Sequence, residues 1–525
     1  MKKNLFLLAA AFCFVSPLFA QSPNIQWQSV IGGSNDERFT NLQQTADGGY
    51  ILAGQSISNI SGNKIENCLG SYDYWVLKLD EIGNIIWQNT IGGEGSDYLW
   101  SIDQTSDGGY IIGGNSDSKI SGDKTENSGD DFDYWVLKLD GVGNIQWQNT
   151  IGGAGLDNLL NVQQTADGGY ILGGYSDSNI SGDKTEDNMG GYDYWIVKLD
   201  SAGNIQWQNT IGGNDADNLY NLAMTTDGGY LLAGKSSSSI SGDKNENNLG
   251  DFDYWVVKLD AGGNIQWQNT IGGNALDTPY SLQQTSDGGC IIGGYSRSGI
   301  SGNKTEDALG NYDYWVVKLD ATGAIQWQNT IGGNSGEGIQ SLQQTTDGGY
   351  ILGGSSESDI SLDKTENNLG VYDYWVIKLY ADGNIQWQKT VGGDQADGLQ
   401  AIQQTTDGGY ILGGFSDSNI SGNKTKSSLG GRDFWVVKLA PDLVPIAGPS
   451  VAQKGLTIHP NPTANAIFVR TDMQRHVRLC NALGQTLAAR TVQNSSEIDL
   501  SNHPDGFYFL IETATGQAHK ILKTK

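Results

Sequence analysis

The sequence is poor in the residues that build most active sites and cross-linked scaffolds. It holds four cysteines, four histidines and nine prolines in 525 residues. All four histidines lie at or beyond His459, so the preceding chain offers no His base and no His metal ligand. Only Cys68, Cys290 and Cys480 follow the first twenty residues. Their odd number and scattered spacing exclude a disulfide framework and predict free thiols.

Positive charge and long apolar runs are also scarce. The chain has 31 Lys and Arg against 59 Asp and Glu, a formal net charge of −28. That balance argues against nucleic acid or an anionic membrane surface as partner. One apolar run, Leu5–Val15, follows Lys2 and Lys3 and is too short to span a bilayer. It predicts a signal peptide over residues 1–20, and hence an exported protein that does not span a membrane.

Glycine, in contrast, is abundant, and one phrase returns every 60 residues. Each unit contains four short runs typical of strands, for example "NLQQT", "YILGG", "YWIVKL" and "NIQWQNT", with turn residues between them. No unit shows sustained helical spacing. A fixed period of this size indicates a propeller, a solenoid or an array, and four-stranded units repeated radially are propeller blades. The "DGG" turns begin at Asp47, Asp107, Asp167, Asp227, Asp287, Asp347 and Asp407.

The two ends of the repeat region decide between a closed ring and an open array. The segment "NIQWQSVIGG" from Asn24 is a fourth strand without the three that should precede it. The last unit stops at Ala440 after three strands. Together they complete one blade and leave no open sheet edge, whereas a solenoid would need capping repeats. The sequence therefore predicts an all-β protein with a seven-bladed β-propeller over residues 24–440, in which the N-terminal strand completes the last blade.

Three repeated features are predicted to be structural. Fourteen of the fifteen tryptophans occupy two repeat-locked places, which favours packing between blades over an exposed sugar platform. A lysine late in each third strand is expected to pair with the aspartate of a DGG turn. An isoleucine begins the "ISG" of six long loops and the "ISL" of the seventh, and it is expected to anchor each loop. These isoleucines are Ile60, Ile120, Ile180, Ile240, Ile300, Ile360 and Ile420.

The pattern "GYILGG … YWVVKLD..GNIQW" resembles the blade repeat of pyrroloquinoline-quinone-type propellers. The resemblance runs from Asn24 to Ala440 and implies the fold only. In that family the resemblance implies eight blades and a set of residues that hold the quinone. This sequence has seven units and lacks such a set of residues. No quinone cofactor is therefore predicted.

Each variable connection between blades has a carboxylate at the same position, just before the innermost strand that follows it. The fold would place these side chains around one mouth of the central channel, where they could attract a metal ion or a cationic ligand. The alternative is a set of strand-start caps bonded to local backbone N–H groups. The long loops also carry Asp, Asn, Ser and Glu, which leaves Ca²⁺ as an alternative to a hydrogen-bonded surface loop, although the EF-hand pattern is absent. The candidate ligand- or cation-binding residues are Glu37, Asp97, Asp157, Asp217, Asp277, Glu337 and Asp397.

The composition changes after Leu439. Residues 441–454 are predicted to be a linker and residues 455–525 a small β-sandwich. This segment resembles the type A C-terminal sorting domain of the type IX (Por) secretion system of Bacteroidetes, through "HPNPT", "NALGQ", "IDLS", "DGFYFLIET" and the terminal "KILKTK". The resemblance implies the type IX secretion machinery as partner and delivery to the outer-membrane surface or the medium. The matching sorting-signal residues include Pro460, Asn461, Pro462, Gly506 and Tyr508.

Near-identical blades without histidine favour binding over catalysis, because catalysis needs one carboxylate made unlike its neighbour. The sequence predicts no catalytic residue and no enzyme. It predicts an exported cell-surface or secreted binding protein whose propeller recognises a carbohydrate or protein ligand on the long-loop face. Two alternatives stay open: a glycan-acting hydrolase that uses paired carboxylates, and a purely structural surface or adhesion protein.

Overall fold

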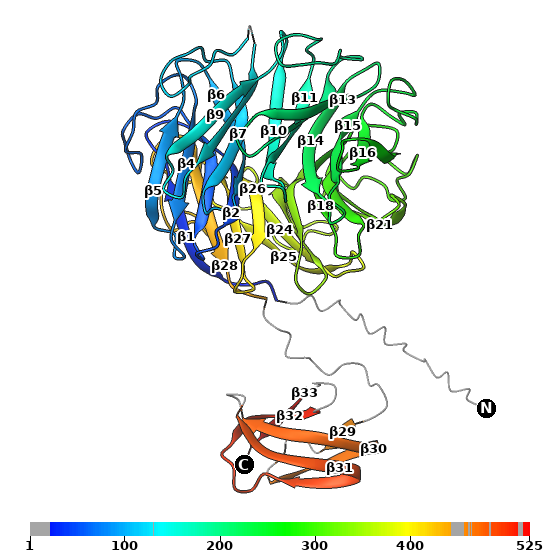
Figure 1. Ribbon diagram of the computed structural model, residues 1–525. Helices are drawn as coiled ribbons and strands as arrows, with labels where there is room; N and C mark the ends of the chain where they lie inside the picture. Colours follow the sequence, from blue (N-terminus) through cyan, green and yellow to red (C-terminus); the bar gives the residue numbers. More distant parts are fainter. Residues whose placement is uncertain are drawn as a thin grey trace, which may run out of the picture. The chain divides into compact units, whose positions relative to one another are not determined.

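The computed structural model describes residues 21–129, 131–442, 456–459, 463, 465–481, 485–512 and 518–524 (Figure 1). The chain divides into two compact units, Met1–Asp442 and Leu443–Lys525. The predicted signal peptide, most of the predicted linker and the three motif residues from Pro460 to Pro462 lie outside the described residues. Within the described part of the chain, no helix is long and apolar enough to cross a membrane.

The first unit consists of seven four-stranded antiparallel sheets. The innermost strands are β2 (Glu37–Gln44), β6 (Asp97–Gln104), β10 (Asp157–Gln164), β14 (Asp217–Met224), β18 (Asp277–Gln284), β22 (Glu337–Gln344) and β26 (Asp397–Gln404). The second strands are β3 (Tyr50–Ser56), β7 (Tyr110–Ser116), β11 (Tyr170–Ser176), β15 (Tyr230–Ser236), β19 (Cys290–Ser296), β23 (Tyr350–Ser356) and β27 (Tyr410–Ser416). The third strands are β4 (Asp73–Leu79), β8 (Asp133–Leu139), β12 (Asp193–Leu199), β16 (Asp253–Leu259), β20 (Asp313–Leu319), β24 (Asp373–Leu379) and β28 (Asp433–Leu439). The outermost strands are β5 (Ile85–Ile91), β9 (Ile145–Ile151), β13 (Ile205–Ile211), β17 (Ile265–Ile271), β21 (Ile325–Ile331), β25 (Ile385–Val391) and β1 (Ile25–Ile31).

The seventh blade is built from both ends of the repeat region, as predicted. Its strand order is β1-β28-β27-β26, and β1 pairs antiparallel with β28 from Ile25 opposite Leu439 to Ile31 opposite Phe434. Each innermost strand contacts the next one, and β2 contacts β26, so the circle of blades closes. We number the blades from 1 (β2–β5) to 7 (β26–β28 with β1). The closure removes the free sheet edge that an open array would expose.

The tight-turn face is held by the DGG aspartates, as blade 3 illustrates. Asp167 Oδ1 accepts hydrogen bonds from Thr165 Oγ1 and from Gly169 N (3.0 Å), and Gly168 takes a φ of +81° that only glycine adopts freely. Lys198 Nζ lies 3.0 Å from Asp167 Oδ2. Although burial acts in the opposite direction, the hydrogen bond from Thr165 and the ion pair with Lys198 lower the pKa of Asp167 to about 2. The same pair recurs in all seven blades, which confirms the predicted Lys–Asp pairs.

We expect Asp167→Asn to lower the free energy of unfolding by about 1 kcal/mol at pH 7. The amide keeps an acceptor for Thr165 and Gly169, and Lys198 keeps Leu199 O and Gln206 Oε1 as acceptors. Only the charge is lost, on a side chain that is 56% exposed. Because the pKa of Asp167 is depressed, its contribution disappears as the pH falls from about 4 through about 2. Urea unfolding at pH 7 measures the difference, and equal midpoints would mean that the ion pair contributes nothing.

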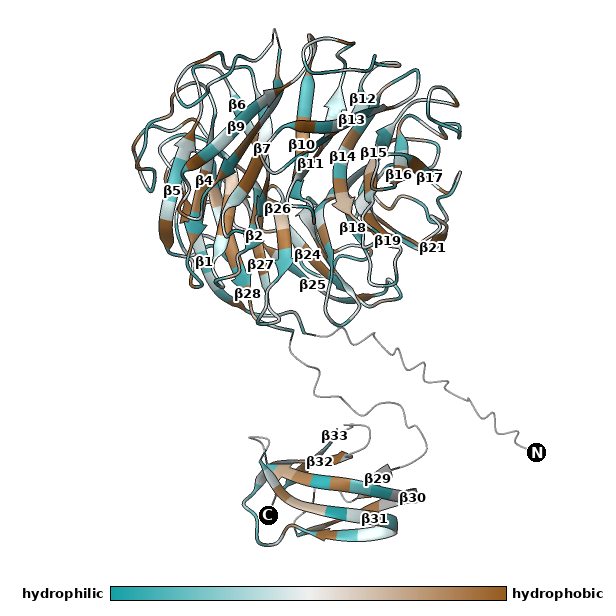
Figure 2. Ribbon diagram, in the orientation of Figure 1, coloured by the Kyte–Doolittle hydropathy of each residue, from teal (hydrophilic) through white to brown (hydrophobic). Residues whose placement is uncertain are grey.

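Each interface between blades is a separate apolar core, and hydrophobic residues recur along the strands that form these interfaces (Figure 2). The third-strand tryptophans are fully buried, and the hydroxyl of Tyr134 donates to the backbone oxygen of Trp195 in the next blade at 3.1 Å. The fourth-strand tryptophans are mostly half-buried, and Trp207 meets Tyr230 of the next blade edge to face at 6.0 Å between ring centroids. Both sets of tryptophans therefore pack blades together, which agrees with the prediction.

Glutamines at the ends of the innermost strands form a second link between blades. Gln43 Oε1 accepts from Gln104 N at 2.8 Å, and Gln104 Oε1 accepts from Ala46 N at 2.9 Å. Equivalent bonds recur around the ring except at blade 4, which has Ala223 and Met224 at these positions, and Gln44 Oε1 accepts from Thr406 N to join blade 1 to blade 7. These side chains satisfy backbone groups that no strand pairing reaches.

The long loops pack differently from the prediction. The seven loop isoleucines are 60–66% exposed and anchor nothing. The lysine four residues later is buried instead, as is a serine two residues before the isoleucine; in blade 3 Lys184 and Ser178 are both 1% exposed. A short bridge between Ser181 and Lys184 turns the loop back on itself and points the lysine inward. The prediction that the isoleucines anchor the loops is wrong, because this turn places each isoleucine on the outer side of its loop.

The second unit is all-β and has its own core. Its strands are β29 (Leu456–His459), β30 (Ala466–Asn481), β31 (Thr486–Asp499), β32 (Gly506–Glu512) and β33 (Ala518–Lys523). They form one hydrogen-bonded sheet in the order β29-β30-β32-β33, with β31 also paired to β30. The β30–β31 pairing is irregular between Thr471 and Arg475. Residues from both halves of β30 nevertheless share one core. In the described residues the strands form one sheet folded over that core, where the sequence predicted a sandwich.

Candidate functional site

The seven carboxylates predicted to ring the channel mouth are buried. All are 0% exposed. Asp157 Oδ2 accepts from Gly153 N at 2.6 Å and from Ser178 Oγ at 3.1 Å, and Glu37 accepts from Gly33 N at 2.8 Å and Ser56 Oγ at 2.9 Å. They thus cap the connection between blades, which is the alternative that the sequence left open to a cation-binding ring. The expectation of a ligand-binding ring is corrected, because these side chains turn into the blade interfaces instead of the channel.

Each buried carboxylate belongs to a repeated charged unit. In blade 3 the unit consists of Asp157, Lys184 and Asp193, and Asp193 in turn faces Asp217 of blade 4. Lys184 Nζ donates to Thr210 Oγ1 at 2.6 Å and lies 5.5 Å from the Trp195 ring centroid. Two acids and one base per blade leave an excess of negative charge away from water. Burial, together with the charge of Asp217, therefore raises the pKa of Asp193 to about 6.

The loop acids also act as hydrogen-bond acceptors. Asp183 Oδ2 accepts from Gly152 N at 3.3 Å, and Glu126 Oε2 accepts from Thr150 N at 2.7 Å. Within the described ranges, no three His, Cys, Asp or Glu side chains converge as they would on a metal ion. Cys68, Cys290 and Cys480 are free thiols, as predicted.

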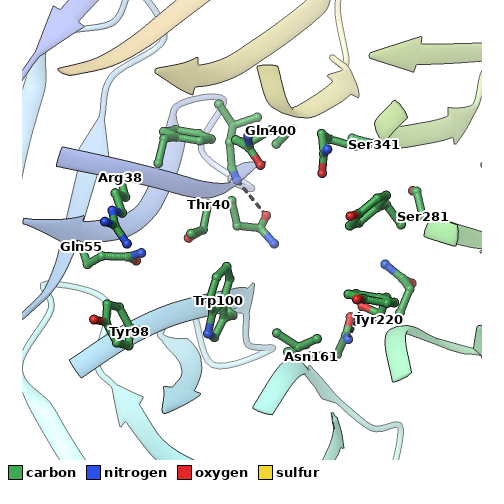
Figure 3. A pocket seen from close by; sticks show the side chains of 18 of the residues that line it. Arg38, Thr40, Gln55, Tyr98, Trp100, Asn161, Tyr220, Ser281, Ser341 and Gln400 are labelled. Atoms are coloured by element: carbon green, nitrogen blue, oxygen red, sulfur yellow. Dashed lines mark hydrogen bonds between the residues drawn. The ribbon is translucent and has the colours of Figure 1, made fainter. Parts of the chain in front are cut away.

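The open site of the propeller is its central channel at the long-loop end (Figure 3). This cavity has a volume of about 630 Å³. Its walls are the first halves of the innermost strands, with the ends of β3, β11 and β27 contributing at the mouth. These positions differ from blade to blade, whereas the rest of each blade is nearly constant. The asymmetry of the protein is therefore concentrated where a ligand could enter.

Aromatic side chains cover one side of the channel. Trp100 on β6 is 37% exposed and is the one tryptophan that falls outside the two repeat-locked places. Tyr98 and Tyr220 project toward the same space (Figure 3). The ring centroids of Tyr220 and Tyr280 lie 5.2 Å apart with the ring planes tilted by 55°, and burial raises the pKa of both phenols well above the usual value. Both phenols therefore stay neutral, and that of Tyr280 is hydrogen-bonded to Tyr295.

The opposite side of the channel is polar. Blades 1, 6 and 7 contribute Thr40, Gln340, Ser341 and Gln400. Arg38 lies at the mouth beside Gln55, with its guanidinium 4.4 Å from the Tyr72 ring centroid. The lining contains no Asp, Glu, His or Cys side chain among the described residues. A channel with one aromatic wall and one amide and hydroxyl wall suits a ligand with an apolar face and several hydroxyl groups.

A side groove extends from the channel over blades 5 and 6. Its volume is about 320 Å³, and it shares Gln340 with the channel. Tyr295, Tyr312 and Tyr372 line it, and the rings of Tyr280, Tyr295 and Tyr312 follow one another at 5.9 and 5.3 Å. Gly338 carries no side chain where other blades place Arg38 or Tyr98, and this opens the groove. A chain-like ligand can therefore run from the channel onto the face.

Sequence reasoning missed the channel residues because it followed what the repeats share. The signal that could have found them was the departure from the repeat. Trp100 stands where other blades have Thr40, Leu160 or Gln340, and aligning the seven units column by column isolates that position. The conserved columns describe the scaffold, and the variable columns describe the site.

Comparisons with known proteins define the C-terminal unit. Residues 457–524 match the family model of the secretion system C-terminal sorting domain. This confirms the resemblance and implies secretion or attachment to the cell surface by the type IX machinery. Two residues of the sorting motif lie in the described part: Gly506 opens β32 with a φ of +149°, and Tyr508 is buried and donates to Pro504 O.

The repeats have distant relatives. The regulatory protein FlaEY of Caulobacter vibrioides is 24% identical over 322 residues, which cover 56% of this chain and 33% of that protein. The chain therefore spans about a third of the length of this relative. Among solved structures, the Neurospora crassa Pan2 WD40 domain has a TM-score of 0.41 and 12% identity, covering 78% of this chain and 90% of its own. A Dyadobacter fermentans protein of unknown function gives 0.43 and 10%, covering 80% and 99%.

Proposed function

We propose that this protein is a secreted or surface-attached glycan-binding protein that takes its ligand into the long-loop end of the propeller channel. The observation that carries the proposal is Trp100, an exposed tryptophan in the channel of a propeller whose other tryptophans pack between blades. The apolar face of a pyranose ring stacks on such a side chain, while the tyrosine hydroxyls and amides opposite reach its hydroxyl groups. A protein ligand is the alternative that the test distinguishes.

The proposal is binding without turnover. Glycoside hydrolysis uses two carboxyl groups on either side of the scissile bond. The described channel lining offers none, and the nearest repeated carboxylates are buried in the blade interfaces. A propeller held together by seven similar blades provides a rigid frame, which lowers the entropic cost of ordering a binding site.

We expect Trp100→Ala to weaken glycan binding at least tenfold, because stacking on an aromatic ring contributes roughly 1.4 kcal/mol or more. A glycan array on the purified chain identifies the ligand, and titration calorimetry measures the affinity. Tyr380→Ala is the matched control: Tyr380 is 50% exposed but lies in a tight turn on the opposite face. Binding that survives Trp100→Ala unchanged, or a chain that captures peptides and no glycan, would contradict the proposal.

A further inference from the structure

Four of the seven propeller cations that do not belong to the repeat lie at the long-loop end of the inner strands, whereas Lys119 and Lys426 lie in long loops and Lys389 lies in an outermost strand. Between residues 21 and 442 the only arginines are Arg38, Arg297 and Arg432. They come from the ends of the inner strands that face the long loops, in blades 1, 5 and 7. Lys235 occupies the same end of blade 4, at a position where the other blades have Gln55, Asn115, Tyr175, Tyr295, Ser355 and Phe415. In a chain of net charge −28, four cations at the same end of the propeller are unexpected, which points to a binding role for them.

Most of these cations lack an acidic partner. Arg432 pairs with Asp417 at 3.2 Å. Arg38 and Lys235 form no ion pair within the described residues, and neither does Arg297, whose guanidinium lies 5.6 Å from the Tyr312 ring centroid. Lys235 Nζ lies 4.8 Å from the Phe252 centroid and 5.6 Å from that of Tyr220, a residue of the channel wall. It donates no hydrogen bond to any described residue.

Lys235 is the informative member of this group. Its side chain is half-buried between two rings, and burial lowers its pKa. Holding an ammonium group there without a counter-charge costs free energy, which an incoming anion would recover. Blades 1 and 4 lie across the ring from each other, so Arg38, which lines the channel, and Lys235, which lies against the channel-wall residue Tyr220, stand on opposite sides of it. The buried acids of the blade interfaces do not reach this space.

We propose, on the basis of the glycan-binding function above, that the channel selects anionic glycans, with Arg38 and Lys235 reading an acidic group on the sugar chain. Arg297 lines the side groove with Tyr312 and Tyr372, which carry the neighbouring sugars; Glu357, which accepts a hydrogen bond from the Tyr312 hydroxyl at 3.4 Å, also lines this groove. The acidic group is a uronate carboxylate or a sulfate ester, which share a negative charge and oxygen acceptors. An acidic protein repels such chains at long range, so the local cations supply the attraction.

The test compares matched ligands on the full mature chain. A hexamer of galacturonic acid, its fully methyl-esterified form and a sulfated hexasaccharide are titrated by calorimetry. We expect one of the two anionic hexamers to bind at least tenfold more tightly than the ester, and its affinity to fall as NaCl rises from 50 to 500 mM. Carboxylate and sulfate are distinguished by which anionic hexamer binds better.

Variants separate this inference from the function on which it rests. Lys235→Gln should weaken the anionic hexamer about tenfold and leave the ester within twofold, and Arg38→Gln should act in the same direction. Lys426→Gln removes an exposed charge from a long loop and should change neither. Equal binding of ester and anionic hexamers would overturn the inference while leaving glycan binding intact. If no glycan bound at all, the proposed function itself would fall.

Discussion

A chain without residues 21–31 should fail to form a stable propeller. The deletion removes β1, which supplies the outermost strand of blade 7 and buries Val30 and Ile31. It leaves β28 with an open edge and strips Trp435 Nε1 of its acceptor, Gln28 Oε1 at 3.1 Å. The lost burial and pairing are worth about 5 kcal/mol or more, which is comparable with the whole stability of many proteins. Size-exclusion chromatography and thermal unfolding should show aggregated or unfolded material.

Two further experiments make this result specific to closure. A synthetic peptide spanning Asn24–Gly33, added in trans, should restore a folded monomer, because it can zip onto β28 in the same register. Removal of residues 443–525 is the control, since they form a separate compact unit. That truncation should leave the melting temperature of the propeller within a few degrees. A deletion variant that melts like the full chain would show that blade 7 does not need β1.

The propeller should be more stable at pH 5 than at pH 8. The folded state raises the pKa of Asp133 to about 7 and of Asp193, Asp253 and Asp313 to about 6, chiefly through burial. Groups whose folded pKa lies above the unfolded value stabilise the fold at low pH, and this stability is lost as the pH rises from about 4 through 6–7. A shift of about two units corresponds to roughly 3 kcal/mol for one group. Since neighbouring acids titrate together, we expect a total of about 5 kcal/mol, or a melting temperature about 10 °C lower at pH 8.

Other titrating groups leave this window clear. The turn aspartates have pKa values lowered to about 2 in blades 1 to 5. Their contribution to stability is therefore lost only below about pH 4. Burial lowers the pKa of the loop lysines, to about 8 for Lys124, Lys244 and Lys364, so their cost is constant below pH 7 and begins to fall near pH 8, which offsets only a small part of the loss. Maximum stability should therefore fall near pH 4–5.

Asp193→Asn isolates one charged unit. Asp193 Oδ1 is buried and accepts no hydrogen bond within the described residues, so an amide there removes a charge without removing a contact. We expect a gain of about 1–3 kcal/mol at pH 8 and a shallower dependence on pH, measured by urea unfolding. Asp200→Asn, in an exposed turn with a lowered pKa, should leave the slope between pH 5 and 8 unchanged. Marked destabilisation of Asp193→Asn at pH 8 would show that the ionised carboxylate is needed and would contradict this account.

The sequence predicted the arrangement of the strands correctly, but it predicted the burial of individual side chains less well. Blade number, strand order and the complementary ends followed from the 60-residue period, because strand pairing depends on local pattern and chain connectivity. The Lys–Asp pairs of the tight turns followed as well, since hairpin geometry brings them together. The candidate carboxylates were placed at the correct strand starts but assigned the wrong surroundings. The loop isoleucines were expected inside and lie outside.

The amino-acid sequence by itself determined a closed ring of seven blades and an exported chain with a sorting domain. Only the tertiary structure decided which side of each innermost strand meets the channel. Side chains alternate across a strand, and the twist of seven packed sheets turns Asp97 into a blade interface and Trp100 into the open channel. That choice depends on the packing of neighbouring blades, which no single repeat contains.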